Sequence, residues 1–265
     1  MDFLRLMKVC LVASFVFSCT SAKKTIVDSS KTQLHLLGMY TLPFNLQFKN
    51  TTIGGLSGID YDTSHDLYYI ISDDRSAINP ARFYKARIAL SDKGIDSVQF
   101  VDVDFMLQPG GNNYPDAKQD ALHVPDPESL RFNPATNELL WTSEGERIVR
   151  KADTILSDPS IMLMNTEGRF IDSFILPGNV HMKASQQGPR QNGVFEGSTF
   201  VKNQSRLLVS IEEPLYEDGP RAGLNDSAAV LRILEFDVKD RKPLAQYAYR
   251  ADAVAHPPHP PGSFR

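Results

Sequence analysis

Short hydrophobic runs that alternate with polar residues recur along most of this chain, separated by turns rich in Gly, Pro, Asn and Asp. A period of two is typical of β-strands that turn one face to a core. No stretch shows a sustained helical period, and the only helical candidate is the short, Asp-containing segment 151–156. The pattern therefore predicts an all-β protein whose first strand covers residues 34–42.

One pair of these strands occurs in three copies that can be laid over one another without a gap. The first strand of each copy is predicted at 54–61, 127–132 and 195–200, and the second at 67–74, 139–145 and 207–213. The copies start 71 and 68 residues apart. A fixed spacing of this kind is typical of repeat architectures.

Each copy continues with two more predicted strands, at 82–90 and 97–106, 160–165 and 170–176, and 230–238 and 244–249. Four antiparallel strands make one blade of a β-propeller, so the sequence predicts about three blades. Closed propellers use roughly 4 to 8 blades. We therefore expect residues 34–265 to form an incomplete ring that is truncated at its C-terminus, with 34–42 as an outer strand.

The bulk composition is that of a globular protein. The chain has 265 residues, 42% of them hydrophobic and 23% charged, with a formal net charge of -4. Because there is no basic excess, a nucleic-acid partner is not expected. The acidic residues gather at specific places instead of forming tails, which favours a local cation site. The partner we expect is a small-molecule ester substrate.

The N-terminus resembles an export signal of the bacterial lipoprotein type. Arg5 and Lys8 precede an apolar run at 9–17, which is too short to span a bilayer, and Cys19 follows. We expect residues 1–18 to be removed, Cys19 to carry the lipid, and 19–33 to be a tether to the cell envelope. An ordinary secretory signal, cut near Ser21 or Ala22, is the alternative.

Two acidic columns run through the three copies. Ser57, Glu128 and Glu196 share the first column, and Asp73, Glu144 and Glu212 share the second, sixteen residues later. In an antiparallel pair, the start of the first strand and the end of the second lie at the same edge. The columns, together with neighbouring Asp74, therefore predict a ring of carboxylates at one end of the propeller axis.

Crowded carboxylates favour a cation that neutralises their repulsion. Oxygen ligands without Cys or clustered His select hard ions, and calcium suits an exported protein better than magnesium. The predicted metal ligands are Asp73, Asp74, Glu128, Glu144, Glu196 and Glu212. Glu128 and Glu196 are also candidate catalytic groups, with Arg75 and Arg147 as phosphate contacts. The alternative is that these acids are ordinary solvent-exposed residues at the ends of strands and bind no ion.

A serine nucleophile is a weaker hypothesis. Gly55-Leu56-Ser57-Gly58 resembles part of a nucleophile elbow, but Ile59 stands where a Gly-x-Ser-x-Gly motif needs glycine. The α/β context of such an elbow is also missing from the predicted strands.

Five ordered motifs resemble the phytase-like family called "esterase-like activity of phytase". They are Gly55-Leu56-Ser57-Gly58-Ile59, Ser72-Asp73-Asp74-Arg75, Asp126-Pro127-Glu128-Ser129-Leu130, Ser143-Glu144-Gly145-Glu146 and Asn192-Gly193-Val194-Phe195-Glu196-Gly197. The resemblance runs from about residue 50 to the C-terminus. It implies an exported β-propeller related to phosphoesterases with calcium sites. Members continue with a further Asn-Gly-x-x-Glu repeat after the Pro-rich loop, which this sequence does not reach.

The expected function is metal-dependent hydrolysis of a phosphate ester at the propeller end. Two alternatives stay open at this point. One is a propeller that binds a ligand or partner without catalysis, and the other is a hydrolase of carboxylic esters or lactones on the same scaffold.

Overall fold

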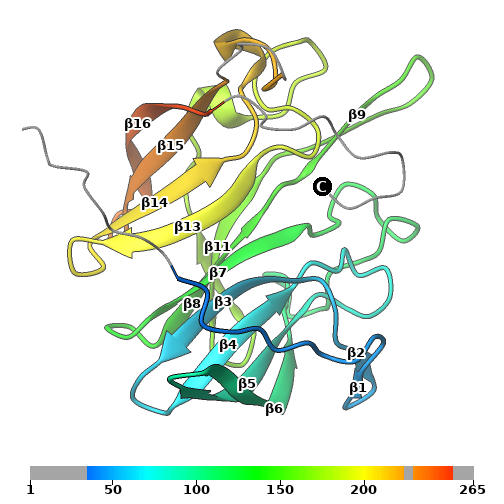
Figure 1. Cartoon of the computed structure of the whole chain (residues 1–265). Coiled ribbons are helices and arrows are strands. Elements are labelled where there is room, and N and C mark those ends of the chain that lie inside the picture. Colours follow the sequence, from blue (N-terminus) through cyan, green and yellow to red (C-terminus); the bar gives the residue numbers. More distant parts are fainter. Residues whose placement is uncertain (1–34, 224–228, 253–265) are drawn as a thin grey trace, which may run out of the picture. The chain divides into compact units, whose positions relative to one another are not determined.

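The computed structural model describes residues 35–223 and 229–252, which form strands and loops with two short 3-10 turns, Gly178–Val180 and Tyr216–Asp218. Three four-stranded antiparallel sheets account for most of the strands (Figure 1). They are blades of a β-propeller, as the repeat predicts. Within the described part of the chain, no helix has the length and apolar character to cross a membrane.

Blade 1 follows the first predicted copy. Its strands pair in chain order: β3 (Leu56–Asp62), β4 (Leu67–Ser72), β5 (Arg82–Ser91) and β6 (Gly94–Phe105). All four predicted strands of this copy are confirmed. The alternation along β4 and β5 puts Tyr69, Ile71 and Phe83 on one buried face of the sheet.

Blade 2 follows the second copy, with one insertion. Its strands are β7 (Pro127–Asn133), β8 (Glu138–Ser143), β11 (Ser160–Asn165) and β12 (Phe170–Ser173). Between β8 and β11 the chain forms a separate hairpin, β9 (Glu146–Val149) and β10 (Thr154–Ser157). The helical candidate at 151–156 is therefore not a helix. Residues 154–156 are in β10 instead, where Leu156 pairs with Arg147 and Ile155 with Ile148, and six residues are too few for a stable helix.

Blade 3 follows the third copy. Its strands pair in chain order: β13 (Phe195–Val201), β14 (Arg206–Ile211), β15 (Val230–Asp237) and β16 (Lys242–Arg250). The described strands thus confirm three blades, each with four strands.

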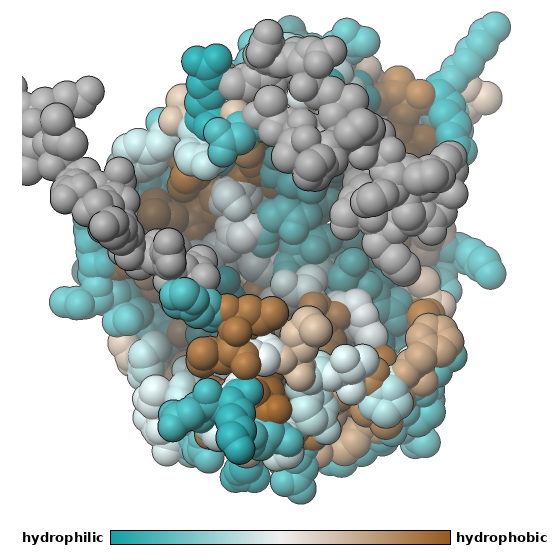
Figure 2. Space-filling view, viewed as in Figure 1, coloured by the Kyte–Doolittle hydropathy of each residue, from teal (hydrophilic) through white to brown (hydrophobic). Residues whose placement is uncertain are grey.

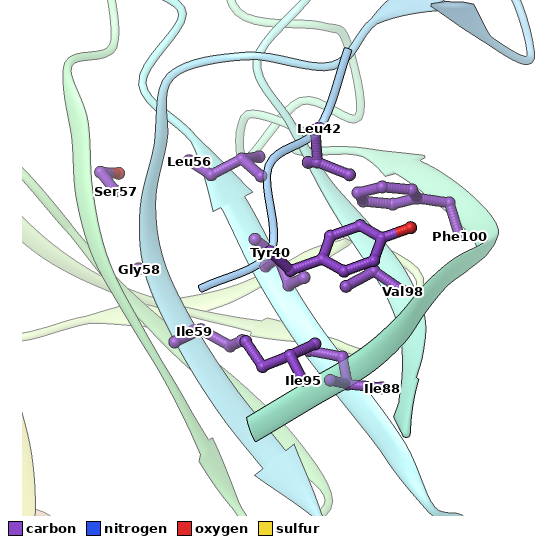
Figure 3. A pocket seen from close by; sticks show the side chains of 11 residues that line it. Tyr40, Leu42, Leu56, Ser57, Gly58, Ile59, Ile88, Ile95, Val98 and Phe100 are labelled. Carbon is purple, nitrogen blue, oxygen red and sulfur yellow. The ribbon is translucent and has the colours of Figure 1, made fainter. Parts of the chain in front are cut away.

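The strand expected at residues 34–42 is not formed. Residues 35–43 have no ladder partner, and a small hairpin follows them, made of β1 (Gln47–Phe48) and β2 (Thr51–Thr52). Two apolar residues of the 35–43 segment, Tyr40 and Leu42, line a pocket on one face of blade 1 instead of forming a strand. Figure 2 shows hydrophobic residues on the surface where this segment crosses blade 1, and Figure 3 shows the pocket.

Two hydrophobic layers join the blades, and β8 contributes to both. Trp141 lies in the layer shared with Tyr69 and Phe83 of blade 1. Its neighbour Leu140 lies in the layer shared with Leu207 of blade 3 and other buried residues. Successive residues of a strand point to opposite faces, so one alternating strand secures blade 2 to both neighbours.

The first strands of the blades, β3, β7 and β13, lie side by side (Figure 1). Arg131 of β7 donates from Nε to Ser198 O of β13 at 2.6 Å and from Nη1 to Ile59 O of β3 at 3.0 Å. A Cβ at Gly58 would lie 2.8 Å from Leu130 N, so this position requires glycine for the close approach of β3 and β7.

The predictions for the chain ends fall outside the described residues. They concern the signal peptide 1–18, the lipidation of Cys19, the tether 19–33 and the truncation beyond the Pro-rich stretch. These remain predictions from the sequence.

Candidate metal centre

Each blade begins with a β-bulge in the pairing of its first two strands. The bulges lie between Leu56 and Gly58, between Pro127 and Leu130, and between Phe195 and Ser198. The first-column residues Ser57, Glu128 and Glu196 occupy these irregular positions. A bulge re-aims a side chain that a regular strand would direct along the sheet, so the repeat positions these three side chains in the same way.

The second column is positioned by a repeated backbone hydrogen bond. The N–H groups of Asp73, Glu144 and Glu212 donate to the carbonyls of Gly55, Asp126 and Val194, at 2.6, 3.1 and 2.9 Å respectively. Each carbonyl lies two residues before the first-column residue of the same blade. Both columns therefore meet at one end of each blade, which we call the rim.

The rim contains two groups of three carboxylates, and in each group one oxygen atom from every residue lies within 4.8 Å of the others. The first carboxylate group is Asp73, Asp126 and Glu128, from blades 1 and 2. Asp73 is exposed, Asp126 is buried and Glu128 is half-buried.

The second carboxylate group is Glu144, Glu196 and Glu212, from blades 2 and 3. Glu144 is buried and Glu212 is exposed. Each group thus spans a junction between two blades.

Burial and mutual repulsion raise the pKa values of five of the six carboxyls, those of Asp73, Asp126, Glu128, Glu144 and Glu196. Loss of solvent, followed by repulsion from Asp73 and Glu196, raises the pKa of Glu128 to about 9. Burial is also the main reason that the pKa of Glu144 is raised to about 7 and that of Asp126 to about 6. A bound cation would reverse these shifts because it stabilises the charged forms.

The family model for phytase-like proteins, described as "Esterase-like activity of phytase", matches residues 51–264. The chain belongs to this family. Its match covers all three blades and both carboxylate groups. A comparison with curated proteins gives no match.

Solved structures similar to this phytase-like chain include the Dos1 propeller, with a TM-score of 0.41 and 8% identity over 76% of this chain and 39% of that one. The periplasmic gluconolactonase PpgL of Pseudomonas aeruginosa gives a TM-score of 0.34 and 10% identity, over 77% and 60% of the two chains. A putative 6-phosphogluconolactonase from Bacteroides uniformis gives 0.32 and 12%, over 74% and 57%. The phytase-like chain spans less than two thirds of each of these structures.

Of the six metal ligands predicted from the sequence, the phytase-like chain brings five into the two groups, and Asp74 lies outside both. Asp74 is buried and accepts hydrogen bonds from the backbone N–H groups of Ala77, Ile78 and Asn79. It also pairs with buried Arg82 at 2.8 Å. Burial alone would raise its pKa, but these hydrogen bonds lower it. Asp74 therefore closes the turn after β4.

The repeat columns do not include Asp126, which the structure adds to the first carboxylate group. Its position in the repeat corresponds to Gly55 in blade 1 and Val194 in blade 3, so comparison of the copies passes over it. One feature of the sequence does point to Asp126 as a member of the site, its position two residues before Glu128.

Arg75 lies between the carboxylates of Asp126, which precedes β7, and Glu146, in the β9–β10 hairpin. Its Nη2 is 2.5 Å from Glu146 Oε2, and its Nε is 3.6 Å from Asp126 Oδ1. About a third of its side chain stays exposed. Arg75 therefore borders the first carboxylate group and keeps some access to solvent. Glu146, like Asp126, is absent from the predicted site.

The guanidinium of Arg147 contacts other residues of the protein. Its guanidinium donates to the carbonyls of Lys183, Ala184 and Ser185 at 2.8, 3.2 and 3.1 Å. It also lies over the ring of Tyr216, 4.9 Å from the centroid. These contacts give Arg147 a role in holding the long loop after blade 2.

Proposed function

We propose that this protein is a metal-dependent hydrolase that cleaves phosphate esters at the rim. The observation that carries the proposal is the presence of two carboxylate groups at the same end of neighbouring blades, in each of which one oxygen per residue lies within 4.8 Å of the others. Carboxyls with raised pKa values in such a cluster are typical of functional sites.

The donor set fits a hard divalent cation, and calcium is the ion we propose. Both groups offer only carboxylate oxygens, with no sulfur or imidazole ligand. Asp73, Asp126 and Glu128 would hold one ion, and the second carboxylate group would hold another. A bound ion would polarise a phosphoryl oxygen and lower the pKa of a bound water.

The chain's own residues would bind and orient the substrate. Glu128 and Glu196 sit on the bulges and are partly exposed, so each can contact a ligand at the rim. Arg75 can donate an N–H group to a phosphate oxygen beside the first carboxylate group. We do not extend this role to Arg147, whose N–H groups are bonded to loop carbonyls.

A second candidate function is hydrolysis of carboxylic esters or lactones, favoured by the esterase-like description of the matching family. The experiment is to assay purified protein on phytate, p-nitrophenyl phosphate and p-nitrophenyl acetate, with calcium and with a chelator. Phosphatase activity that is lost on chelation supports the first function. Turnover of the acetate alone supports the second, and calcium binding without any turnover supports a binding propeller.

Two charge-removing variants test the site. Glu128→Gln and Glu196→Gln keep the side-chain shape and remove one carboxylate from each group. Both variants should weaken calcium binding, which calorimetry measures, and lower the rate of ester hydrolysis. Glu167→Gln, in the exposed turn before β12, is the matched control. Unchanged calcium affinity in the two rim variants would remove the basis of the proposal.

We also propose that the protein is exported and held at the bacterial cell envelope by a lipid on Cys19. In a bacterial host, wild-type protein should fractionate with membranes and incorporate labelled fatty acid. Cys19→Ser should be released into the soluble fraction. Equal fractionation of both proteins would contradict the lipid anchor.

A further inference from the structure

The long loop after blade 2, residues 174–194, lies at the rim. Strand β12 runs toward the same end of blade 2 as β8, because both are antiparallel to β11. The loop leaves this end of β12 and enters β13 just before Glu196. The short link between β10 and β11, which contains Asp158, lies at this end too, since Ser160 pairs with Ser143 at the end of β8. Two segments that are distant in sequence therefore meet at the end of blade 2 that carries the carboxylates.

His181 in this loop is paired with Asp158. Its Nδ1 donates to Asp158 Oδ2 at 2.7 Å, and the other oxygen, Oδ1, accepts the backbone N–H of Met182 at 2.6 Å. Because the carboxylate accepts the proton of Nδ1, it fixes the tautomer and the direction of the ring. The second ring nitrogen, Nε2, has no hydrogen-bond partner among the described residues, and 44% of the side chain is exposed. Nε2 is therefore available to a ligand.

The loop is fixed on both sides of His181. Its neighbours Val180 and Met182 are buried in the hydrophobic layer that blade 2 shares with blade 3. The guanidinium of Arg147 donates to the carbonyls of the three residues that follow Met182. A group that transfers a proton to a substrate is most effective when it is held in position before the substrate binds. These contacts hold His181 in that way.

A close backbone approach connects this pair to the second carboxylate group. Gly145, which follows Glu144, has a φ of +74°. A Cβ at Gly145 would lie 2.7 Å from the carbonyl carbon of Asp158, so this position requires glycine. Asp158 therefore lies against the residue next to Glu144, and its partner His181 lies on the same side of the rim as the second carboxylate group.

We propose that His181 is a catalytic proton donor for the hydrolysis of an alkyl phosphate bound at the second carboxylate group, with Asp158 as its positioning residue. A water oxygen bonds to phosphorus, the ester P–O bond breaks, and the leaving oxygen keeps the electron pair. That oxygen takes the Nε2 proton of the imidazolium and departs as the alcohol. The ring regains a proton from the attacking water, so ester and water become alcohol and hydrogen phosphate. This inference rests on the proposed function and adds a residue to it.

His123 also lies in a rim loop, between β6 and β7, but its pairing is local. Its Nδ1 donates at 2.7 Å to Asp120, three residues earlier, which also accepts the N–H of Leu122. Hydrogen bonds of this kind are ordinary turn chemistry. The partner of His181, in contrast, comes from a different segment, 23 residues away.

The first test compares a poor leaving group with a good one. His181→Asn keeps a donor near the position of Nδ1 for Asp158 and removes Nε2. Its kcat on glycerol 2-phosphate should fall by roughly 100-fold or more. Its kcat on p-nitrophenyl phosphate should fall by less than about threefold, because nitrophenolate leaves without a proton. Asp158→Asn should show the same dependence on the substrate with a smaller loss. Thermal unfolding checks that both variants fold.

His65→Asn is the matched control. His65 pairs with Asp62 at 2.6 Å in the turn between β3 and β4, at the opposite end of blade 1 from the rim, so both rates should be unchanged. Equal losses on the two esters in His181→Asn would overturn the inference and leave the proposed function standing. A selective loss in His123→Asn instead would do the same. A wild type that cleaves neither ester would overturn the proposed function, and the inference with it.

A binding measurement tests the contact without turnover. Inorganic phosphate, a product of the reaction, is added to the protein in calcium, and the ring nitrogen signals of the histidines are followed by NMR. The signals of His181, assigned by their absence from His181→Asn, should shift, and those of His65 should not. Unchanged signals of His181 would overturn the inference.

Discussion

Glu144 of blade 2 accepts a hydrogen bond from the backbone N–H of Val194 in blade 3, with 2.5 Å between Oε1 and N. The carbonyl of Val194 in turn accepts the N–H of Glu212 at 2.9 Å. Two members of the second carboxylate group are thus connected through one residue. The side chain that would bind a cation also joins two blades.

This double role predicts different outcomes for two substitutions at position 144. Glu144→Ala leaves the buried N–H of Val194 without its acceptor, which should lower the free energy of unfolding by about 1–3 kcal/mol. Glu144→Gln keeps an acceptor oxygen and should lose less. Urea denaturation in chelator measures both, with Glu167→Ala as the control. Equal losses in the two variants at position 144 would contradict the role of this hydrogen bond.

The raised pKa values predict how the stability of the metal-free protein depends on pH. Glu128, with a pKa of about 9, Glu144 with about 7 and Asp126 with about 6 hold protons more tightly in the folded state than in the unfolded chain. Stability conferred by this difference is complete below the ordinary carboxyl values and is lost as the pH rises through the folded values. The Tm in chelator should therefore fall between pH 5 and pH 9.

Calcium should oppose this fall. Because the ion binds the charged carboxylates, the increase in Tm on adding calcium should be larger at pH 9 than at pH 5. Glu128→Gln removes the carboxyl with the highest of these three pKa values and should reduce the change of Tm with pH in chelator. A metal-free Tm that rises steadily over this range would show that the carboxyls are not crowded in solution.

The two carboxylate groups predict two separable calcium sites. Asp73→Asn should weaken one binding event in calorimetry, and Glu212→Gln should weaken the other. Repulsion between the groups links them, so each substitution should have a small effect on the affinity of the remaining site. Loss of both events in either single variant would indicate one shared site.

Asp74 and Asp73 are adjacent, yet substitution of Asp74 should affect stability and substitution of Asp73 should affect calcium binding. Asp74→Asn breaks the buried pair with Arg82 and should lower the free energy of unfolding by about 3–5 kcal/mol, with calcium affinity of the folded protein unchanged. Asp73→Asn should weaken calcium binding and cost little stability in chelator. Denaturation and calorimetry on both variants distinguish the structural acid from the proposed ligand.

A pair of glycines tests the close packing of the first strands. A Cβ at Gly58 would lie 2.8 Å from Leu130 N and 3.2 Å from Glu128 O, whereas nothing lies within 4 Å of one at Gly54. Gly58→Ala should therefore lower the free energy of unfolding by about 1–3 kcal/mol. Gly54→Ala, the control, should be close to neutral. Similar stability of the two variants would mean that β3 and β7 are farther apart than in this structure.

The blades could be predicted from the sequence because strand periodicity is a local property. Leu140 and Trp141 show it directly, since neighbours on one strand face two different core layers. The expectations for 34–42 and 151–156 failed because the sequence pattern does not show which segment, if any, a short apolar run will pair with. Whether Ile155 pairs with Ile148 depends on how the hairpin folds back, which a short apolar run does not specify.

The carboxylate groups were predictable only as far as they follow the repeat. Strand pairing places Glu128 and Glu144 at one end of blade 2, and the spacing of sixteen residues is sufficient to infer this. Asp126 could not be found by comparing the copies, because its counterparts Gly55 and Val194 carry no charge. Asp74 looked equivalent to Asp73, but successive side chains of an extended segment point to opposite sides.

The bulges give each blade one residue that the ladder does not require. At this residue blade 1 has Ser57, whose hydroxyl donates to Pro127 O at 3.2 Å, and the other two blades have glutamates. The same bulge thus accepts a hydroxyl in one blade and a carboxylate in the two others, so the charge at this end of a blade is independent of its strand pairing. A substitution at one such position would therefore alter the proposed cation site and leave the pairing of the strands as it is.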